Sequence, residues 1–356
     1  MVFLALLTFF SDDLAVMLTS NMALATETTN YLHVAQYIVL VNAATQTVTA
    51  YLNGQGNTKT TLHSYMIELP VNIGLSYLLL FGFSYSIPFL GVFTFSGLGL
   101  EGAAFGSLIA IVIRLIFMSV YIKTTEKYNL CSIVKRPSLQ KLTVHFVEIF
   151  PIAANFLVLG VGNTLYLLLF SQLNLYSYVA ITLIFPWTKV ATLSIVAWAQ
   201  ANAISVTQAL GKGNHAHIQV ILSSCIKIGG LMACLMSLLL YGFSLCIEIV
   251  YPNIEHKTVL ALSCIAPLYI ALPLVRAFNT IAGNYLRAMG KSVQVLKIHF
   301  ITQWFIALPL CALVILYFEL SIFWAFALLP LEELMKTLPF YRLLKKHYYK
   351  DSEGLA

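Results

Sequence analysis

Charged residues are scarce in this sequence: they make up 10% of its 356 residues, whereas hydrophobic residues make up 60%. Soluble globular domains carry charge at about a quarter of their positions, so this composition excludes an ordinary soluble domain. Several apolar segments reach the roughly 20 residues that a helix needs to cross a bilayer. The alternation typical of membrane barrels is absent. Because backbone polar groups in lipid must pair internally, we predict an all-α polytopic membrane protein.

Metal-binding and disulfide patterns are sparse as well. The chain has 6 cysteines and no C-x-x-C motif, so we predict neither a disulfide framework nor a cysteine metal site. His215 and His217 form an H-x-H in a short basic loop, which we interpret as a solvated loop rather than a metal site. We expect no cofactor. The net charge of +6 needs no nucleic acid, because a basic cytoplasmic surface on a membrane protein explains it.

Ten apolar segments are predicted to be membrane helices, the first of them incomplete. They lie near residues 1–21, 31–53, 61–84, 98–122, 143–170, 176–210, 216–250, 258–287, 294–317 and 320–345. In the first segment, Asp12 and Asp13 end the apolar run after about ten residues, which is too short to span a bilayer. We interpret that segment as the remaining half of a longer helix.

A repeat indicates how these helices are organised. Residues 51–58 (Tyr-Leu-Asn-Gly-Gln-Gly-Asn-Thr) resemble residues 285–292 (Tyr-Leu-Arg-Ala-Met-Gly-Lys-Ser), and each copy lies between two apolar segments. When the two copies are aligned and extended toward the N-terminus, the second copy continues for about 90 residues beyond the point that pairs with Met1. The sequence therefore predicts two helical lobes related by a parallel pseudo-two-fold repeat, with a truncated N-terminal lobe.

This organisation gives four predicted parts. They are a truncated N-terminal lobe of about four helices (1–122), a cytoplasmic inter-lobe loop (123–142), a C-terminal lobe of six helices (143–346) and a cytoplasmic tail (347–356). Lys and Arg gather in alternate loops and in the tail, so the positive-inside rule places the tail in the cytoplasm. We expect a monomeric, multi-pass protein of a plasma or inner membrane, surrounded by the lipid bilayer.

Several motifs resemble those of the multidrug and toxic compound extrusion (MATE) family. The run Gln208-Ala209-Leu210-Gly211-Lys212-Gly213 looks like the turn at the end of that family's eighth helix. Further resemblances follow the order of the family's helices. Residues 51–58 resemble the exit of helix four, and residues 70–72 resemble part of helix five. Residues 97–104 resemble the entry to helix six, and residues 149–151 resemble the start of helix seven. Together they cover essentially the whole chain. On this resemblance, the chain lacks helices one, two and part of three.

The resemblance implies a V-shaped pair of lobes around a central cavity, with alternating access by rocking. It implies a secondary active efflux transporter, and not an enzyme, that exports amphipathic or cationic small molecules in exchange for H⁺ or Na⁺. Without its first helices, such a chain is expected to transport poorly.

The first candidate site lies in the N-terminal half. Glu68 and Asn72 share one helix face at i, i+4, and Pro70 between them frees backbone carbonyls. The resemblance implies a cation-coupling site here, with Ser107 as a nearby hydroxyl. A carboxylate among apolar groups takes up a proton readily, which suits proton exchange. The family's site also uses an Asp on helix one, so we expect this site to be incomplete.

The second candidate site lies in the C-terminal half. Leu159 and Arg276 stand where the Na⁺-coupled branch of the family has acidic residues, so the resemblance implies no Na⁺ site there. Lys189 and Arg276 are charges within apolar segments and need partners, which Glu332 and Glu333 on the last helix can supply. Three roles remain open for Lys189 and Arg276. They can form a structural charge network, contact substrate in a cavity, or extend to the membrane interface.

Two other functions remain alternatives. A flippase of lipid-linked saccharides shares the MATE architecture, and Lys189 with Arg276 would suit its anionic headgroup. A membrane enzyme would need clustered acidic or histidine side chains. The only acidic pairs are Asp12-Asp13 and Glu332-Glu333, and neither carries a metal-ligand pattern. The sequence therefore favours a transporter.

Overall fold

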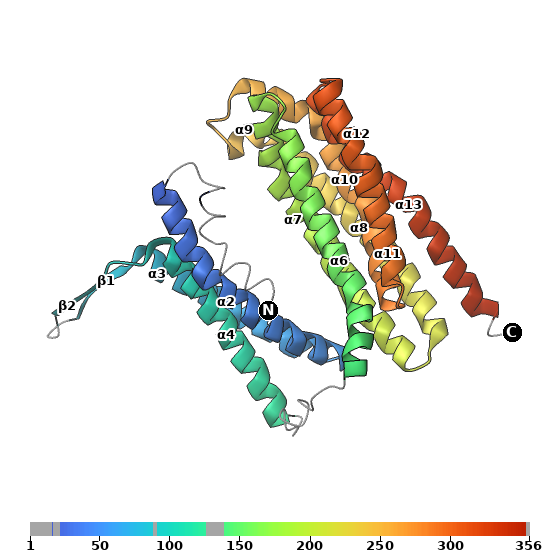
Figure 1. Ribbon diagram of the computed structural model, residues 1–356, viewed down its shortest axis with the longest axis horizontal. Helices are drawn as coiled ribbons and strands as arrows, with labels where there is room; N and C mark the ends of the chain where they lie inside the picture. Colours follow the sequence, from blue (N-terminus) through green and yellow to red (C-terminus); the bar gives the residue numbers. More distant parts are fainter. Residues whose placement is uncertain (1–15, 17–21, 88–90, 126–138, 354–356) are drawn as a thin grey trace. The chain divides into compact units, whose positions relative to one another are not determined.

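The computed structural model describes residues 16, 22–87, 91–125 and 139–353, and nearly all of them are helical (Figure 1). The chain divides into two compact units, Met1–Arg136 and Pro137–Ala356, which are described separately. The predicted helix 1–21, apart from residue 16, and most of the predicted loop 123–142 lie outside the described residues.

The first unit contains helices α2 (Met22–Gly54), α3 (Thr58–Phe81) and α4 (Gly99–Thr125). Two glycines on one face of α4, Gly102 and Gly106, let α3 approach closely. A Cβ atom on Gly102 would overlap the backbone carbonyl of Leu79, and one on Gly106 would collide with the backbone of Ser76. Small residues four positions apart are a common contact surface between membrane helices. This antiparallel contact sets the register in which polar groups of α3 and α4 meet.

A β-hairpin connects α3 with α4, in the connection between the predicted segments 61–84 and 98–122. Strands β1 (Phe83–Ile87) and β2 (Gly91–Phe95) pair antiparallel and project away from the helices of the unit (Figure 1). Gly82 and Gly97 flank the hairpin, both with a φ of 76°. A side chain on Gly82 would overlap the backbone of Phe95, so the hairpin can close only where glycine allows a left-handed backbone.

The second unit begins with four long helices and one short one. They are α6 (Leu139–Phe170), α7 (Leu175–Gly211), α8 (His215–Leu245), the four-residue α9 (Ile247–Val250) and α10 (His256–Ala288). One continuous helical rod follows, with two π-helical stretches: α11 (Ser292–Phe300), η1 (Ile301–Ala307), α12 (Leu308–Ala312) and η2 (Leu313–Tyr317). The last helix is α13 (Ile322–Glu353). Aromatic side chains such as Tyr166, Tyr269 and Phe326 fill the larger apolar core between these helices.

Seven helices of the described residues are long and apolar enough to cross a membrane, by length and composition. They correspond to the predicted segments between 61 and 317. The helices over the predicted segments 31–53 and 320–345, α2 and α13, are long but less apolar; α13 carries Glu332, Glu333 and Lys336. Many large apolar side chains lie exposed on the helices, as lipid-facing residues would. The predicted all-α polytopic membrane fold is confirmed, with one hairpin added.

The repeated sequence pattern forms the same turn in both units. In the first, the Asn57 N–H donates to the Leu52 carbonyl at 2.9 Å; in the second, the Lys291 N–H donates to the Leu286 carbonyl at 2.8 Å. The glycines one residue earlier, Gly56 and Gly290, have φ of 86° and 73°. These bonds and the left-handed glycine are features of a Schellman motif, which ends a helix. The superposition of whole lobes stays a prediction.

Candidate functional site

A buried arginine dominates the polar core of the first unit. The Arg114 guanidinium of α4 is only 2% exposed and reaches across to α3, where its Nη1 lies 2.9 Å from Oε2 of Glu68. Its Nε donates to Ser64 Oγ at 3.2 Å, and its Nη2 donates to Thr49 Oγ1 of α2 at 3.1 Å. The Tyr65 ring lies 3.5 Å from the guanidinium carbon. Arg114 thus joins all three helices of the unit through one charged group.

This arrangement corrects the predicted surroundings of Glu68. The sequence predicts a carboxylate among apolar groups, next to Asn72 and Ser107, but Glu68 forms an ion pair with Arg114. Asn72 Oδ1 accepts instead from Ser107 Oγ at 3.4 Å and from Ser76 Oγ at 3.1 Å. The structure therefore brings Asn72 and Ser107 together. The physical reason is that a carboxylate out of water is best compensated by a cation, and the glycine contact of α4 carries Arg114 to it.

The second unit encloses a cavity of about 790 Å³, which lies within the size range of small-molecule sites. Helical spacing explains how its wall is built, because residues three, four or seven apart share one face. On α6 this face carries Asn155, Leu159, Asn163 and Tyr166. The other lining residues that concern us come from α7 (Lys189, Thr192), α10 (Arg276, Asn279, Arg287), the π-helical rod (His299, Gln303) and α13 (Glu332, Glu333, Lys336).

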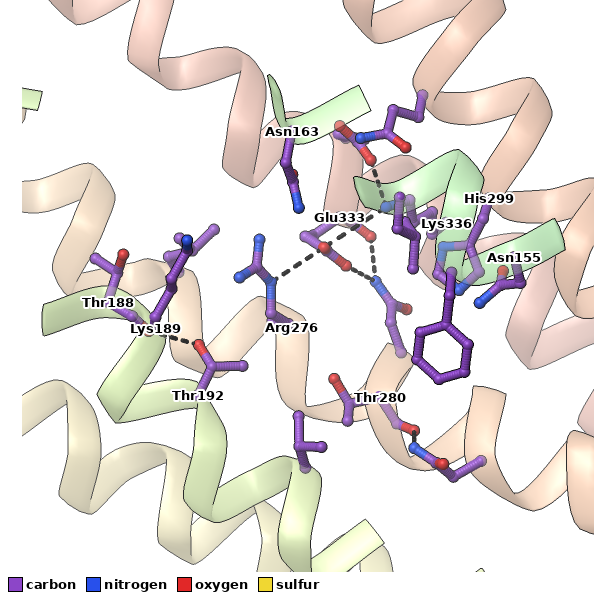
Figure 2. A pocket seen from close by; sticks show the side chains of 18 of the residues that line it. Asn155, Asn163, Thr188, Lys189, Thr192, Arg276, Thr280, His299, Glu333 and Lys336 are labelled. Atoms are coloured by element: carbon purple, nitrogen blue, oxygen red, sulfur yellow. Dashed lines mark hydrogen bonds and ion pairs between the residues drawn. The ribbon is translucent and has the colours of Figure 1, made fainter. Parts of the chain in front are cut away.

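An ion-pair network occupies one side of this cavity (Figure 2). Arg276 Nε lies 3.1 Å from Glu333 Oε1, and Lys336 Nζ lies 3.6 Å from the same oxygen. Lys336 also forms an ion pair with Glu332, one helical turn earlier on α13. The structure thus brings Arg276 and both glutamates together. It adds Lys336, which we did not predict, although its place three and four residues after the two glutamates is a local signal for an ion pair.

Hydrogen bonds complete the surroundings of both carboxylates. The Tyr166 hydroxyl donates to Glu332 Oε2 at 2.6 Å. Asn279 Nδ2 donates to Glu333 Oε2 at 2.9 Å, and Thr337 Oγ1 donates to Asn279 Oδ1 at 3.2 Å. Buried charges are tolerated where such bonds satisfy their remaining lone pairs. The network is therefore a fixed part of the cavity wall.

Lys189 does not join the charge network, which is one of the placements that the sequence leaves open for it, but lines the cavity. It lies on α7 beside Thr188 and Thr192, and Figure 2 shows it on the opposite side of Arg276 from Glu333. Among the described residues it makes no ion pair. The rotation of α7 directs Lys189 to the open space of the cavity rather than toward α13, and this rotation cannot be read from charge spacing alone.

Three further polar side chains of the cavity wall carry buried atoms that lack a hydrogen bond within the described part of the chain. Both amide atoms of Asn155, Oε1 of Gln303 and Nδ1 of His299 are buried and make no hydrogen bond. Asn155 and Gln303 are each 1% exposed. Gly162 on α6 leaves the space that the Gln303 side chain fills. Gln303 lies in η1, and π-helical stretches are frequent at functional sites.

Within the described ranges, no group of three or more His, Cys, Asp and Glu residues is placed to hold a metal ion.

Comparisons with known proteins point to one class. The family model described as MatE matches residues 1–78. No curated protein sequence matches the chain.

Solved structures of MATE proteins resemble the chain over almost its whole length. An outward-facing multidrug resistance MATE transporter of the MOP superfamily has a TM-score of 0.82 at 13% identity, covering 99% of this chain and 77% of its own. A mutant of the Vibrio cholerae MATE transporter VcmN has a TM-score of 0.80 at 15% identity, covering 97% and 76%. A point mutant of another MATE protein has a TM-score of 0.83 at 12% identity, covering 98% and 75%. The chain has the MATE fold, as its sequence motifs predict.

Proposed function

We propose that this chain is a secondary active efflux transporter of the MATE type, acting as a monomer, which exports amphipathic small molecules in exchange for H⁺. One observation carries the proposal: a fold shared with MATE transporters over 97% or more of the chain holds a cavity of about 790 Å³. The cavity wall combines apolar side chains with a few polar groups, as small-molecule sites do. The structural likeness favours this function over the flipping of lipid-linked saccharides.

The first unit supplies the proposed coupling step. Glu68 can be charged and paired with Arg114, as in the structure, or protonated and neutral. Protonation removes the ion pair and leaves Arg114 held by Ser64, Thr49 and the Tyr65 ring. Two states of the transporter that differ in this contact differ in proton affinity, which is what coupling to a proton gradient requires. Asn72 and Ser107 bond to each other two turns from Arg114 and support the same α3–α4 contact.

Sodium is a weaker candidate for the coupling ion. The positive charge of Arg114 already lies against the Glu68 carboxylate, so a bound Na⁺ would meet a like charge there. Asn72 and Ser107 offer neutral oxygens only, whereas hard cations prefer carboxylate ligands in addition.

The test is transport in proteoliposomes made with the purified chain and loaded with a fluorescent amphipathic dye. Transport by this chain is expected to be slow, as the resemblance implies, but we expect an imposed pH gradient to drive measurable dye movement. We expect Glu68→Gln to abolish that stimulation because glutamine cannot exchange the proton. Glu148→Gln is the matched control, since Glu148 is 69% exposed. Dye movement driven by a Na⁺ gradient, or full stimulation in Glu68→Gln, would reject the coupling step. Absence of any driven movement of amphipathic dyes would reject the transporter proposal itself.

A further inference from the structure

The cavity of the second unit has more basic than acidic side chains in its wall. Its lining includes four basic residues, Lys189, Arg276, Arg287 and Lys336, and two acidic ones, Glu332 and Glu333. Both glutamates are already engaged, because Arg276 pairs with Glu333 and Lys336 pairs with both. The positive charge that remains belongs to Lys189 and Arg287, neither of which makes an ion pair with a described residue.

The two remaining cations differ in their surroundings. Arg287 lies in the last turn of α10, where the partial negative charge of the helix end compensates part of its own. Lys189 lies far from either end of α7, which runs from Leu175 to Gly211, so no helix end compensates it. An ammonium within a membrane-spanning helix is unfavourable unless it faces a water-filled cavity or meets an opposite charge, and Lys189 is exposed to the cavity without a carboxylate beside it. Lys189 is therefore the group that a ligand would neutralise.

Unpartnered amides show a second requirement of the same cavity. Asn155 has no hydrogen bond on either amide atom, and Gln303 has none on Oε1, although both side chains are 1% exposed. Buried polar groups are nearly always hydrogen-bonded, and these two face the cavity. Both amides are placed to form hydrogen bonds with a polar part of a bound molecule, or with water when no such molecule is bound.

Apolar side chains form much of the rest of the wall, and many of them come from α6. Ile152, Phe156, Leu159 and Leu167 follow one side of α6, and Leu329 adds to them from α13. This wall suits a hydrocarbon or aromatic body rather than a fully polar solute.

From these features we propose that the cavity binds amphipathic organic anions, whose carboxylate or phosphate pairs with Lys189 while the apolar body lies along α6. As a statement about cargo, the proposal rests on the proposed function; as a statement about binding, it stands on the cavity alone. A cationic ligand would meet the excess positive charge of the wall, which opposes its binding.

The test compares two probes of opposite charge on the full chain in nanodiscs of phosphatidylcholine. The probes are a dansyl-labelled undecanoate and the matching dansyl-labelled undecylammonium, followed by their fluorescence on binding. We expect the undecanoate to bind at least about tenfold more tightly, a difference that one favourable charge contact can supply. We expect Lys189→Gln to remove this preference. Lys297→Gln is the control, because it removes the same charge from an exposed position of the same unit outside the cavity wall.

A second arm separates a lipid phosphate from a free anion as the occupant. When phosphatidylglycerol replaces part of the phosphatidylcholine, weaker undecanoate binding assigns the site to an anionic lipid headgroup, and unchanged binding assigns it to free anions. Either result supports an anion site. Equal or tighter binding of the undecylammonium, or equal losses of undecanoate binding in Lys189→Gln and Lys297→Gln, overturns it. Anion binding without driven transport would reject the proposed function and leave this site standing.

Discussion

Arg114 and Glu68 are charges placed deep in the first unit, with side chains 2% and 15% exposed. Removing one partner of such a pair leaves the other charge uncompensated, which costs roughly 3–5 kcal/mol, whereas replacing both by apolar residues is often neutral. We therefore expect Arg114→Met to lower the free energy of unfolding by about that amount. The double variant Arg114→Met, Glu68→Met should recover most of it.

The measurement is the free energy of unfolding from detergent titrations followed by circular dichroism. Lys123→Met is the control, because Lys123 is exposed on the same helix and should change stability little. If the double variant proved as unstable as Arg114→Met, the lost stability would come from the hydrogen bonds of Arg114 to Ser64 and Thr49 and not from the ion pair.

The charged residues also mark how far sequence reasoning reaches at this scale. Arg276 and Glu333 could be predicted to meet, because a charge in an apolar segment needs a partner and few carboxylates are available. Arg114 was missed, although it interrupts an apolar run two helical turns beyond Gly106 and on the same face. The sequence could not decide between the network and the cavity for Lys189, because helix rotation follows from packing over the whole helix and not from one residue.

At the scale of elements, the contact between α3 and α4 depends on Gly106. A Cβ atom there would collide with the backbone of Ser76, so the helices must separate. We expect Gly106→Ala to destabilise the protein by about 1–3 kcal/mol, the usual effect of overpacking. Gly74→Ala on α3 is the matched control, since nothing lies within 4 Å of its Cβ position. It should be neutral or raise stability by up to about 1 kcal/mol, because alanine favours helix.

The free energy of unfolding, measured for both variants under the same conditions, checks this prediction. Equal stability of Gly106→Ala and Gly74→Ala would mean that α3 and α4 do not approach through Gly106.

Most helices could be predicted from the sequence, because long apolar runs end at polar turns, and α7, α10 and the rod from α11 to η2 begin and end within two residues of the predicted segments. The β-hairpin could not be predicted with the same method, since hydropathy alone does not distinguish it from a loop. The alternation Phe83-Ser84-Tyr85-Ser86-Ile87 is a strand signal of period two that a dedicated search would have found. The π-helical stretches leave no comparable pattern in the sequence.

For the whole molecule, three helix-ending turns offer a test of how the chain crosses the membrane. The turns at Gly56, Gly213 and Gly290 have the same left-handed glycine and the same pattern of bonds to the preceding helix. If each long helix crosses once, α3, α4, α6 and α7 separate the first turn from the second, and α8 and α10 separate the second from the third. Even numbers of crossings return the chain to the same side.

The charge pattern says which side that is. Lys59, Lys212, Arg287 and Lys291 lie at or next to these turns, whereas Lys257 is the one basic residue in the opposite connections 82–98, 171–174, 246–257 and 318–321. The positive-inside rule therefore predicts that all three turns lie in the cytoplasm and that α13 returns the C-terminus to that side.

We expect single cysteines at Asn57, Lys212 and Lys291, in a background with the 6 native cysteines replaced by alanine, to react with a membrane-impermeant maleimide only in inside-out vesicles. A cysteine in place of Glu255, exposed at the start of α10, should react only in intact cells. Even numbers of crossings place the three turns on the same side of the membrane. Labelling of all three from outside would therefore show that the predicted orientation is reversed, while the number of crossings stands. Labelling of one turn from the side opposite to the other two would contradict the helix count itself, and with it the assignment of α3 to α10 as single crossings.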